Sequence, residues 1–434
     1  MAATCSTIGI GARRFAVLVG RRSLVLLPLL CLCCLPAASQ TRELERVGRG
    51  DERGGYESAG YVTDSRRIGA LGGNSARLHA IAASPPLGLP PLPGKQAVTA
   101  AGIELGRRLF FDRRLSFNAT LSCAMCHVPE QGFTQNELAT PVGMEGRSVR
   151  RNAPALYNVA YRETLFFDGR EETLEQQIWS PLLAANEMGN PSVGTVLRRL
   201  RELGDYDADF RALYGKGIGM ETLGRALAGY QRALLSADSP FDRWYFGGEA
   251  DALRASAKRG FALFVGNDCA ECHRIGDGYA HFTDDGFHNT GLGFRRAMEP
   301  NRRLQLAPGV FVDREDDIAA PQISDLGRYE ATRRPQDRWK FRTPSLRNVA
   351  VTAPYMHDGS LATLAEVIDF YDAGGVPNQG LDSRVRPLGL APEQKQDLVA
   401  FLKSLNGSNL DALAADARLA PVGDPNPAST DRGR

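Results

Sequence analysis

The sequence predicts a mainly α-helical protein built from two similar halves. Amphipathic stretches with helical spacing recur along the chain, whereas signals for β-strands are sparse. One short cysteine motif occurs twice, at residues 123–127 and 269–273, which suggests a duplicated unit. With 434 residues, the chain is long enough for two or three domains with sizeable cores.

The composition excludes several classes of protein. Hydrophobic residues make up 43% of the chain and charged residues 24%, values that exclude a collagen-like, a wholly disordered or a multi-span membrane protein. The 52 lysines and arginines nearly balance the 50 acidic residues, giving a net charge of +2. This balance carries no electrostatic footprint for nucleic acid, and we expect no nucleic-acid partner.

Residues 1–39 have the pattern of an export signal peptide. A region with four arginines precedes an apolar run, Leu24 to Leu35, and Ala37-Ala38-Ser39 offers small residues for cleavage. The apolar run is too short for an ordinary transmembrane helix, although an uncleaved anchor is the alternative. Cleavage would change the net charge from +2 to −2. We expect a periplasmic protein whose mature chain has no transmembrane helix.

Cleavage at this site would leave four cysteines, in two pairs. Each pair has two residues between its cysteines and a histidine directly after it: Cys123-Ala-Met-Cys126-His127 and Cys269-Ala-Glu-Cys272-His273. This is the attachment signature of c-type haem, because two thiols on one turn reach the haem vinyl groups and the imidazole binds the iron. Two disulfides or a zinc site are the alternatives for an exported chain. Two matches that use every remaining cysteine favour two covalent haems.

The segments around these motifs have distinct characters. Residues 40–95 are rich in Arg, Gly, Ser and then Pro, and we interpret them as a flexible extension and linker. Helices are predicted at 99–111 and 252–264, directly before the two motifs. Leu109-Phe110 and Leu263-Phe264 stand at matching places in these helices, which supports duplication of a cytochrome c-like unit.

Two capping boxes predict further helices. Thr173-x-x-Gln176 opens a helix that should break near Pro181. Thr363-x-x-Glu366 opens a helix whose buried face carries Tyr371. We therefore expect two tandem cytochrome c-like haem domains. The full predicted layout is a signal peptide at 1–39, a linker at 40–95, haem domains at 96–245 and 246–407, and a flexible tail at 408–434.

Other short motifs accompany the cysteine motifs in a fixed order. They include Leu109-Phe-Phe-Asp112, Arg151-Asn-Ala-Pro154, Phe167-Asp-Gly-Arg170, Asn186-Glu-Met188, Ser239-Pro-Phe-Asp242, Thr343-Pro-Ser-Leu-Arg-Asn348 and Thr352-Ala-Pro-Tyr-Met-His-Asp-Gly359. With these motifs, residues 95–407 resemble the bacterial di-haem cytochrome c peroxidases and their MauG relatives. The resemblance implies two cytochrome c-like domains with a calcium ion between them. It also implies that one haem reacts with peroxide and the other relays electrons.

The resemblance assigns roles near the first haem. His127 matches the iron ligand, Glu187 the catalytic glutamate, Gln177 the active-site glutamine and Pro181 the proline of that pocket. Cleavage of peroxide needs a base that takes a proton from one oxygen and returns it to the other. A carboxylate in a partly apolar pocket could have the raised pKa that suits this task. The residue pattern alone would make Glu187 a surface acid at a helix end.

Many family members have a histidine where Met144 aligns, and that histidine caps the peroxide-reacting haem. This chain has no histidine between His127 and His273. Because a thioether is a poor partner for ferric iron, we expect an open iron. Weak ligation by Met144, or a methionine in a solvent loop, are the alternatives.

The second haem needs an axial ligand opposite His273. Tyr371 aligns where the family has a methionine or, in MauG, a tyrosine. A phenolate donates electron density and lowers the iron potential. A packed core tyrosine is the alternative reading of Tyr371, and Met356 and Met298 are rival ligands. His357 and His288 are polar residues expected nearby.

The resemblance also implies a calcium site, whereas the chain departs from MauG at two positions. Asn152, Thr352 and Pro354 match the calcium ligands, supplying one side-chain oxygen and two carbonyls, which are hard donors suited to calcium. An inter-haem tryptophan of the family is replaced by Phe167, which oxidises far less readily. A surface tryptophan that MauG uses aligns near Asn267.

Together, these features predict a di-haem c-type peroxidase. It would reduce hydrogen peroxide to water with electrons from a small periplasmic redox protein, a cytochrome c or a cupredoxin. The cofactors would be two covalent c-type haems and one calcium ion. A MauG-like di-haem oxidase that modifies a protein or small molecule is an alternative, as is a non-enzymatic di-haem electron carrier. Homodimer formation is left open.

Overall fold

The computed structural model describes residues 75–94, 98–298, 303–307, 310–313 and 325–418. The expected signal peptide at 1–39 lies outside the described residues. The fold is mainly helical, as predicted from the sequence. Its strands form two antiparallel pairs: β1 (Phe287–His288) with β4 (Phe341–Arg342), and β2 (Arg303–Ala307) with β3 (Val310–Asp313). In the part of the chain described here, no helix is long and apolar enough to cross a bilayer.

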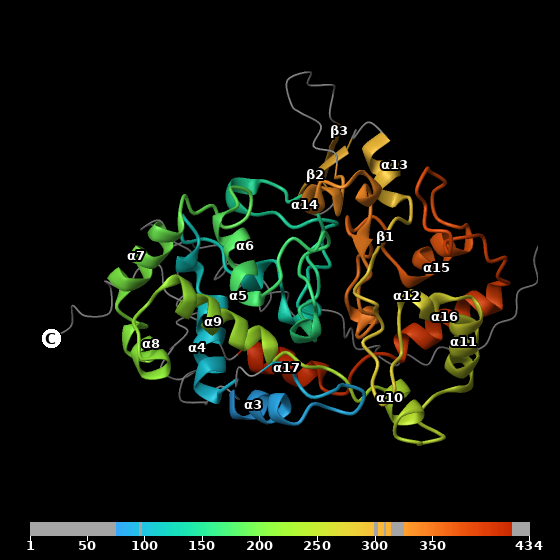
Figure 1. Cartoon of the computed structure of the whole chain (residues 1–434), viewed down its shortest axis with the longest axis horizontal. Helices are drawn as coiled ribbons and strands as arrows, with labels where there is room; N and C mark the ends of the chain where they lie inside the picture. Colours follow the sequence, from blue (N-terminus) through green and yellow to red (C-terminus); the bar gives the residue numbers. More distant parts are fainter. Residues whose placement is uncertain (1–74, 95–97, 299–302, 308–309, 314–324, 419–434) are drawn as a thin grey trace, which may run out of the picture. The chain divides into compact units, whose positions relative to one another are not determined.

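The helices follow one another along the chain with short connections (Figure 1). The first half contains α3 (Ser75–Ala83), α4 (Ala100–Phe111), α5 (Leu174–Gln177), α6 (Trp179–Leu183), α7 (Val193–Leu203), α8 (Asp207–Tyr214), α9 (Met220–Arg232) and α10 (Pro240–Tyr245). The second half contains α11 (Ala255–Gly266), α12 (Cys269–Cys272), α13 (Leu292–Met298), α14 (Tyr329–Thr332), α15 (Leu364–Asp372), α16 (Pro392–Lys403) and α17 (Leu410–Arg418).

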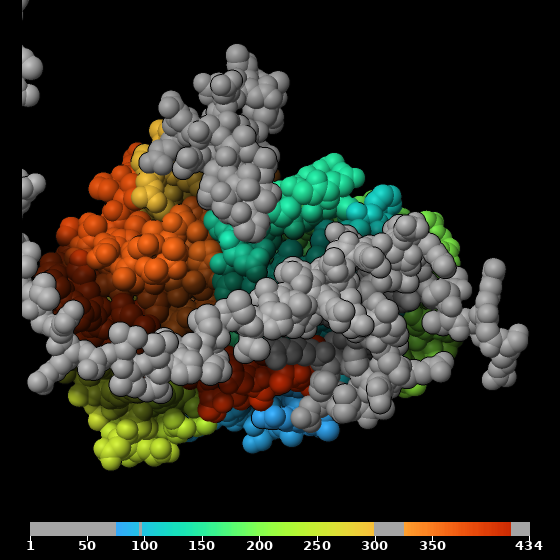
Figure 2. All heavy atoms as spheres, turned by 180° about the vertical axis from the view of Figure 1, so that it is seen from behind, coloured from blue at the N-terminus to red at the C-terminus, as the bar shows by residue number. Residues whose placement is uncertain are grey.

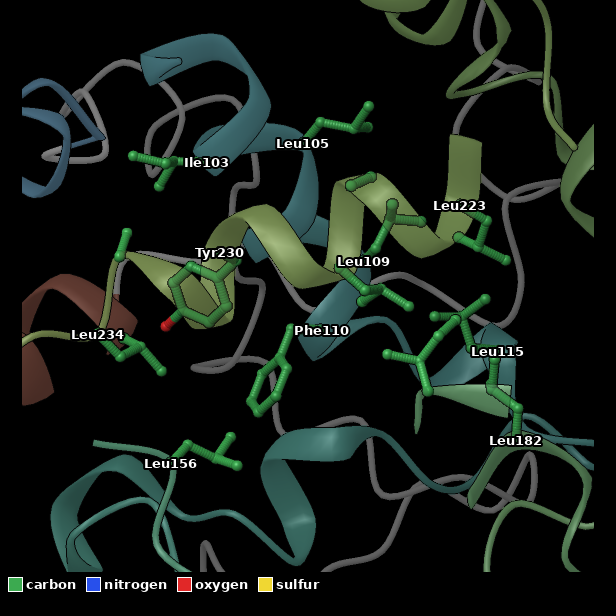
Figure 3. Packing of buried hydrophobic residues seen from close by; sticks show 14 of the residues in the cluster. Ile103, Leu105, Leu109, Phe110, Leu115, Leu156, Leu182, Leu223, Tyr230 and Leu234 are labelled. Carbon is green, nitrogen blue, oxygen red and sulfur yellow. The ribbon is translucent and has the colours of Figure 1, made fainter. Parts of the chain in front are cut away.

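The core of the first half forms where α4 packs against α9. Leu109 and Phe110 of α4 are buried against Leu223 and Tyr230 of α9, and Figure 3 shows these side chains gathered between the two helices. Gly106 allows the close approach, because a Cβ there would lie 2.0 Å from the carbonyl oxygen of Ala226 on α9.

The second half repeats this arrangement with α11 and α16. Phe264 and Phe401 are buried in its core, with ring centroids 4.9 Å apart. Gly260 lies four residues before Phe264, as Gly106 lies four residues before Phe110. A Cβ on Gly260 would lie 1.9 Å from the carbonyl oxygen of Asp397. The same device at the same place supports the expected internal duplication.

The helix opened by Thr173 breaks earlier than expected. Thr173 caps α5, which ends at Gln177, and α6 begins at Trp179 with Pro181 inside it. Proline has no N–H, and its ring clashes with the carbonyl four residues before it, which here belongs to Gln177. The break therefore falls on the N-terminal side of Pro181 and leaves Gln177 at a helix end.

Two segments expected to be loose contain helices packed on the first core. Within the expected linker, α3 buries Leu78 there. Within the expected tail, α17 returns to the same core and buries Leu413 and Ala417. Figures 1 and 2 show α17 beside α3, although the two are far apart in sequence. Helices of nine residues give a weak sequence signal, because packing against residues far away in the sequence decides whether they form.

A buried ion pair joins α10 to the second half, and its arginine also holds the segment after α3 by a hydrogen bond. Arg347 and Asp242 are both almost fully buried, with 2.9 Å between the guanidinium and the carboxylate. Arg347 also donates to the carbonyl oxygens of Gly88 and Ala280. Gly88 has a φ of +91°, and a Cβ there would lie 2.1 Å from the Asp242 carboxylate. Only glycine fits this crossing.

We expect that Leu413→Ala destabilises the protein by about 2–5 kcal/mol, because it opens a cavity in a packed core. Leu413 is 2% exposed. The measurement is chemical denaturation, with the exposed Asp411→Ala on the same helix as the matched control, for which we expect a change within about 0.5 kcal/mol. Equal stabilities of Leu413→Ala and the parent would contradict the packing of α17.

Candidate functional site

One cavity of about 510 Å³ receives side chains from both halves of the chain. It brings together eleven of the twelve predicted site residues: Cys126, His127, Asn152, Gln177, Glu187, Cys269, Cys272, His273, Thr352, Pro354 and Tyr371. The twelfth, Cys123, begins the turn that carries Cys126. Residues far apart in the sequence therefore line a single space.

The two cysteine motifs have the same local geometry. Each forms one helical turn, closed by a bond from the backbone N–H of the histidine to the carbonyl oxygen of the first cysteine. The N···O distance is 2.9 Å for His127 and Cys123 and 3.0 Å for His273 and Cys269. The turn places both thiols and the imidazole along one short stretch of chain, as covalent haem attachment requires.

A second hydrogen bond orients each imidazole. Nδ1 of His127 donates to the carbonyl oxygen of Phe133 at 3.0 Å, and Nδ1 of His273 donates to that of Phe282 at 2.9 Å. A carbonyl can only accept, so each Nδ1 carries the proton and each Nε2 is left as the ligand atom. Burial lowers the pKa of both histidines, which keeps the imidazoles neutral and able to bind iron.

The other lining groups fit two haems. No disulfide joins the four cysteines of the motifs, which leaves each thiol available for attachment to haem. Burial is the main cause that raises the pKa of Cys123 and Cys126 to about 12. Burial also lowers the pKa of Arg342 to about 9. An anionic propionate group would stabilise that charge. Seven more arginines line the cavity: Arg150, Arg151, Arg162, Arg170, Arg347, Arg384 and Arg386.

A tight loop holds Glu187 in the cavity wall. Its N–H donates to the carbonyl oxygen of Ala184, and its own carbonyl oxygen accepts from the N–H of Met144 at 2.9 Å. Burial raises the pKa of the Glu187 carboxyl above its ordinary value, and the positive charge of Arg170 partly opposes this. Gln177 and Pro181 line the same cavity from the broken helix. The carboxyl lies near enough to Cys126 for its charge to raise the pKa of that thiol.

Met144 is buried, and its side chain packs over Gly189. A Cβ on Gly189 would lie 3.1 Å from Cε of Met144. Met144 is absent from the residues that line the cavity in the described part of the chain. Its side chain therefore packs within the protein rather than in a solvent loop, and its placement gives no support to ligation of iron.

Tyr371 enters the cavity from α15 close to the second cysteine motif. Thr363 caps this helix in the predicted box with Glu366, and both predicted cap bonds are present. Burial, and then the nearby thiols of Cys272 and Cys269, raise the pKa of the Tyr371 phenol above its ordinary value. The phenol is thus neutral until a cation lies beside it. Of the rival ligands, Met356 lines the cavity, whereas Met298 is 65% exposed and does not.

The two nearby histidines also line the cavity. The His357 ring stacks on Phe341 with centroids 3.6 Å apart, and burial lowers its pKa to about 4. His288 lies 2.8 Å from a carboxylate oxygen at each ring nitrogen, Asp284 at Nε2 and Asp382 at Nδ1. Ligand atoms of Cys272, Asp284 and His288 lie within 4.8 Å of one another. Attachment of Cys272 to haem would remove its thiol from this group.

The expected calcium ligands come from two segments that meet in the cavity wall. Asn152 is buried, its N–H donates to the carbonyl oxygen of His357 at 2.8 Å, and its side-chain amide nitrogen donates to that of Ala139 at 3.0 Å. These bonds fix the side chain and leave its oxygen as the ligand atom. Thr352 and Pro354 lie on the segment that ends at His357.

Sequence reasoning missed the cations and the stacked pair of this cavity. Arg170 lies over the Phe166 ring at 3.4 Å and near Glu187, while Arg342 donates to the carbonyl oxygen of Thr164. The stack of Phe341 on His357 was missed as well. A single arginine or phenylalanine in a loop or in a two-residue strand has no periodic signal. His288 was expected nearby, but its carboxylate partners were not.

Comparisons with known proteins place this chain in a family. Residues 100–250 match the family model described as "Di-haem cytochrome c peroxidase", and residues 257–406 match the one described as "Cytochrome c". The methylamine utilization protein MauG of Methylorubrum extorquens is 37% identical over 318 residues, which cover 73% of this chain and 81% of that protein. The cytochrome-c peroxidase IdrP1 of Denitromonas iodatirespirans is 38% identical, covering 74% of this chain and 86% of that protein.

A solved structure agrees with these relatives. It is described as a MauG-like protein associated with microbial copper homeostasis, is 33% identical and has a TM-score of 0.62. The match covers 75% of this chain and 96% of that one. Both haem motifs and both matched regions lie within one chain, so this protein is an oxidoreductase that belongs to the di-haem cytochrome c peroxidase and MauG family.

Proposed function

We propose that this protein reduces hydrogen peroxide at the haem bound by His127, with electrons that arrive through the haem bound by His273. A haem iron, when bound, supplies the redox chemistry, and the chain supplies ligands, proton transfer and orientation. The observation that carries the proposal is the half-buried Glu187 carboxyl, which shares one cavity with His127 and Gln177. An electron carrier would need no such proton-transfer group.

Glu187 acts as the base and then as the acid. Its carboxylate accepts the proton from one peroxide oxygen and returns it to the leaving oxygen, which departs as water. The raised pKa makes the carboxylate a stronger base than an exposed glutamate would be. Gln177 at the end of α5 is placed to hold peroxide by a hydrogen bond, and Pro181 offers no side-chain donor that would compete.

We predict that Glu187→Gln slows the reaction with peroxide by about 10²–10⁴-fold, because the amide cannot accept the proton. In the parent, the rate should fall as the pH drops through a pKa above the ordinary range of a glutamate, since only the ionised carboxylate is the base. That acid limb should be missing from the variant. The measurement is stopped-flow absorbance of the Soret band at several pH values.

The exposed Glu145→Gln is the matched control, since Glu145 lies one residue from Met144 but is paired with Arg147 at the surface. It should leave the rate and the pH profile unchanged. Parental rates in Glu187→Gln would reject Glu187 as the proton-transfer group.

We propose Tyr371 as the axial ligand opposite His273. Tyr371 lies beside Cys269 and Cys272, on a helix whose N-terminus is fixed by both bonds of a capping box, and this position supports the role. Iron bound to the phenol oxygen would take the place of the proton. The positive charge of the iron would lower the pKa of the phenol, which burial raises. An anionic oxygen ligand stabilises the higher oxidation state and gives the second haem a low potential.

We expect Tyr371→Met to raise the reduction potential of the second haem, because a neutral thioether replaces an anionic oxygen. Spectroelectrochemical titration of the two haems measures this shift. Tyr355→Phe is the control: Tyr355 also lines the cavity, but its hydroxyl donates to the carbonyl oxygen of Val349. An unchanged potential and spectrum in Tyr371→Met would remove Tyr371 as the ligand.

A MauG-like oxidase that modifies a protein or small molecule is the second candidate. Tyr371 favours it, since an oxygen ligand stabilises high oxidation states. Phe167 weighs against it. Phe167 lies in the cavity wall, where its carbonyl oxygen accepts from the N–H of Arg342 at 2.8 Å, and its ring is hard to oxidise. Asn267, at the C-terminal end of α11, is likewise not a redox-active side chain.

We propose that Asn152, Thr352 and Pro354 bind one calcium ion. The proposal is supported by the fixed amide of Asn152 and by the placement of all three residues in one cavity wall. Electrons would come from a small cytochrome c or cupredoxin. The signal-like pattern of residues 1–39 supports a periplasmic location.

Asn152→Ala should weaken calcium binding, because the substitution removes the only side-chain oxygen of the proposed set. Isothermal titration of chelator-treated protein with calcium measures this. The exposed Asn136→Ala should bind calcium as the parent does. Equal affinity in Asn152→Ala and the parent would place the ion elsewhere.

A further inference from the structure

A continuous cluster of aromatic rings leads from the second haem motif to the surface. It lies between α10, α11 and α16, and Phe241 is at its centre. Its members are Phe241, Trp244, Tyr245, Phe246, Phe261, Phe264, Phe282 and Phe401. Neither iron binding nor proton transfer at Glu187 uses these rings.

The cluster begins at the group that orients the iron ligand. Nδ1 of His273 donates to the carbonyl oxygen of Phe282 at 2.9 Å. The Phe282 ring lies edge-on to Phe241, with centroids 5.3 Å apart. Phe241 stacks on Tyr245 with centroids 5.1 Å apart and an interplanar angle of 13°. One hydrogen bond and two ring contacts therefore connect His273 to Tyr245.

The two ends of this route differ in exposure. Phe241 is fully buried, whereas Tyr245 is 46% exposed. The phenylalanines are hard to oxidise, so an electron can only tunnel through their packed rings and does not reside on them. Tyrosine and tryptophan can hold the oxidised state themselves. Among the rings of the cluster, only Tyr245 and Trp244 can do so.

Electrostatics favours Tyr245 over Trp244. The Lys258 ammonium lies 5.8 Å from the centroid of the half-buried Trp244 ring. A positive charge over the ring stabilises neutral tryptophan and opposes its radical cation. Tyr245 loses its phenolic proton on oxidation and so gains no charge, and its exposure lets water accept that proton.

We propose that Tyr245 is a surface site of one-electron oxidation, coupled through Phe241 and Phe282 to the His273 haem, at which small phenols act as reductants. The inference rests on the proposed peroxide reaction, which supplies the oxidant. Tyr245 gives one electron to the oxidised haem and one proton to water. The resulting neutral tyrosyl radical takes one hydrogen atom from a phenol, which becomes a phenoxyl radical. Two such turns balance one peroxide: one peroxide and two phenols give two waters and two phenoxyl radicals.

The test locates the oxidised residue directly. The full haem-loaded protein is mixed with one equivalent of hydrogen peroxide and a nitroso spin trap, without reductant, and the adduct is mapped by peptide mass spectrometry. We expect the adduct on Tyr245 and its loss in Tyr245→Phe. The variant keeps the ring that stacks on Phe241, so its fold should be intact. A second measurement follows oxidation of 2,6-dimethoxyphenol, which should lose most of its rate in Tyr245→Phe.

Tyr279→Phe is the matched control. Tyr279 is 37% exposed, but its ring contacts that of His281 rather than a ring of the cluster. This variant should keep both the adduct on Tyr245 and the phenol oxidation. Peroxide should still change the Soret band at the parental rate in Tyr245→Phe, because that reaction belongs to the other haem.

The outcomes separate this inference from the proposed function. A Soret response with the adduct elsewhere, or with undiminished phenol oxidation in Tyr245→Phe, overturns the role of Tyr245 and leaves the peroxide reaction standing. A parent protein whose Soret band does not respond to peroxide, before or after partial reduction, overturns the proposed function and this inference with it.

Discussion

The proposed haem sites depend on how the histidine of each cysteine motif is held. In both halves, a one-turn cysteine motif delivers the imidazole, and a backbone carbonyl, that of Phe133 or Phe282, accepts from Nδ1. Because a carbonyl accepts only, the tautomer is fixed, and Nε2 is the ligand atom in each case. The surrounding packing keeps the imidazoles buried and neutral. Any haem attached to the motifs thus has its position set by backbone geometry, and the remaining cavity residues act relative to that position.

Helix packing places the motifs in turn. Gly106 and Gly260 remove the side chain that would prevent α4 from touching α9 and α11 from touching α16. The close contact leaves little freedom in where each cysteine motif begins after its helix. Substituting either glycine would push apart two helices whose side chains form the core. The effect would reach the cysteine motifs without touching them, because the second motif begins three residues after α11 and the first follows α4 in the same core.

The sequence predicted what is local and missed what is long-range. The two cysteine motifs, the caps at Thr173 and Thr363 and the helix before the first motif follow from short patterns, and each is present in the structure. α17 could not be predicted, because its stability comes from burying Leu413 in a core whose members outside α17 lie between Leu78 and Leu234 in the sequence. The residues of the candidate site show the same difference between local and long-range signals. Resemblance supplied Glu187 and Tyr371, whereas no local pattern indicated Arg342.

Because the two halves are similar, their corresponding positions can be compared, and one such position in the cavity wall differs. In the first half, an isolated bridge pairs Leu165 with Glu171, and the Thr173 cap follows. Pro181 stands eight residues after that cap, in the broken helix. In the second, Tyr355 pairs with Leu361, and the Thr363 cap opens a helix that continues unbroken to Asp372. Counted from the two caps, Pro181 and Tyr371 hold the same position. Proline there ends the first helix segment after one turn and brings no ligand atom, whereas tyrosine there extends the second helix and offers an oxygen. Under the proposed function, this one position in a repeated unit would separate the site that binds peroxide, beside Gln177 and Glu187, from the site that relays electrons.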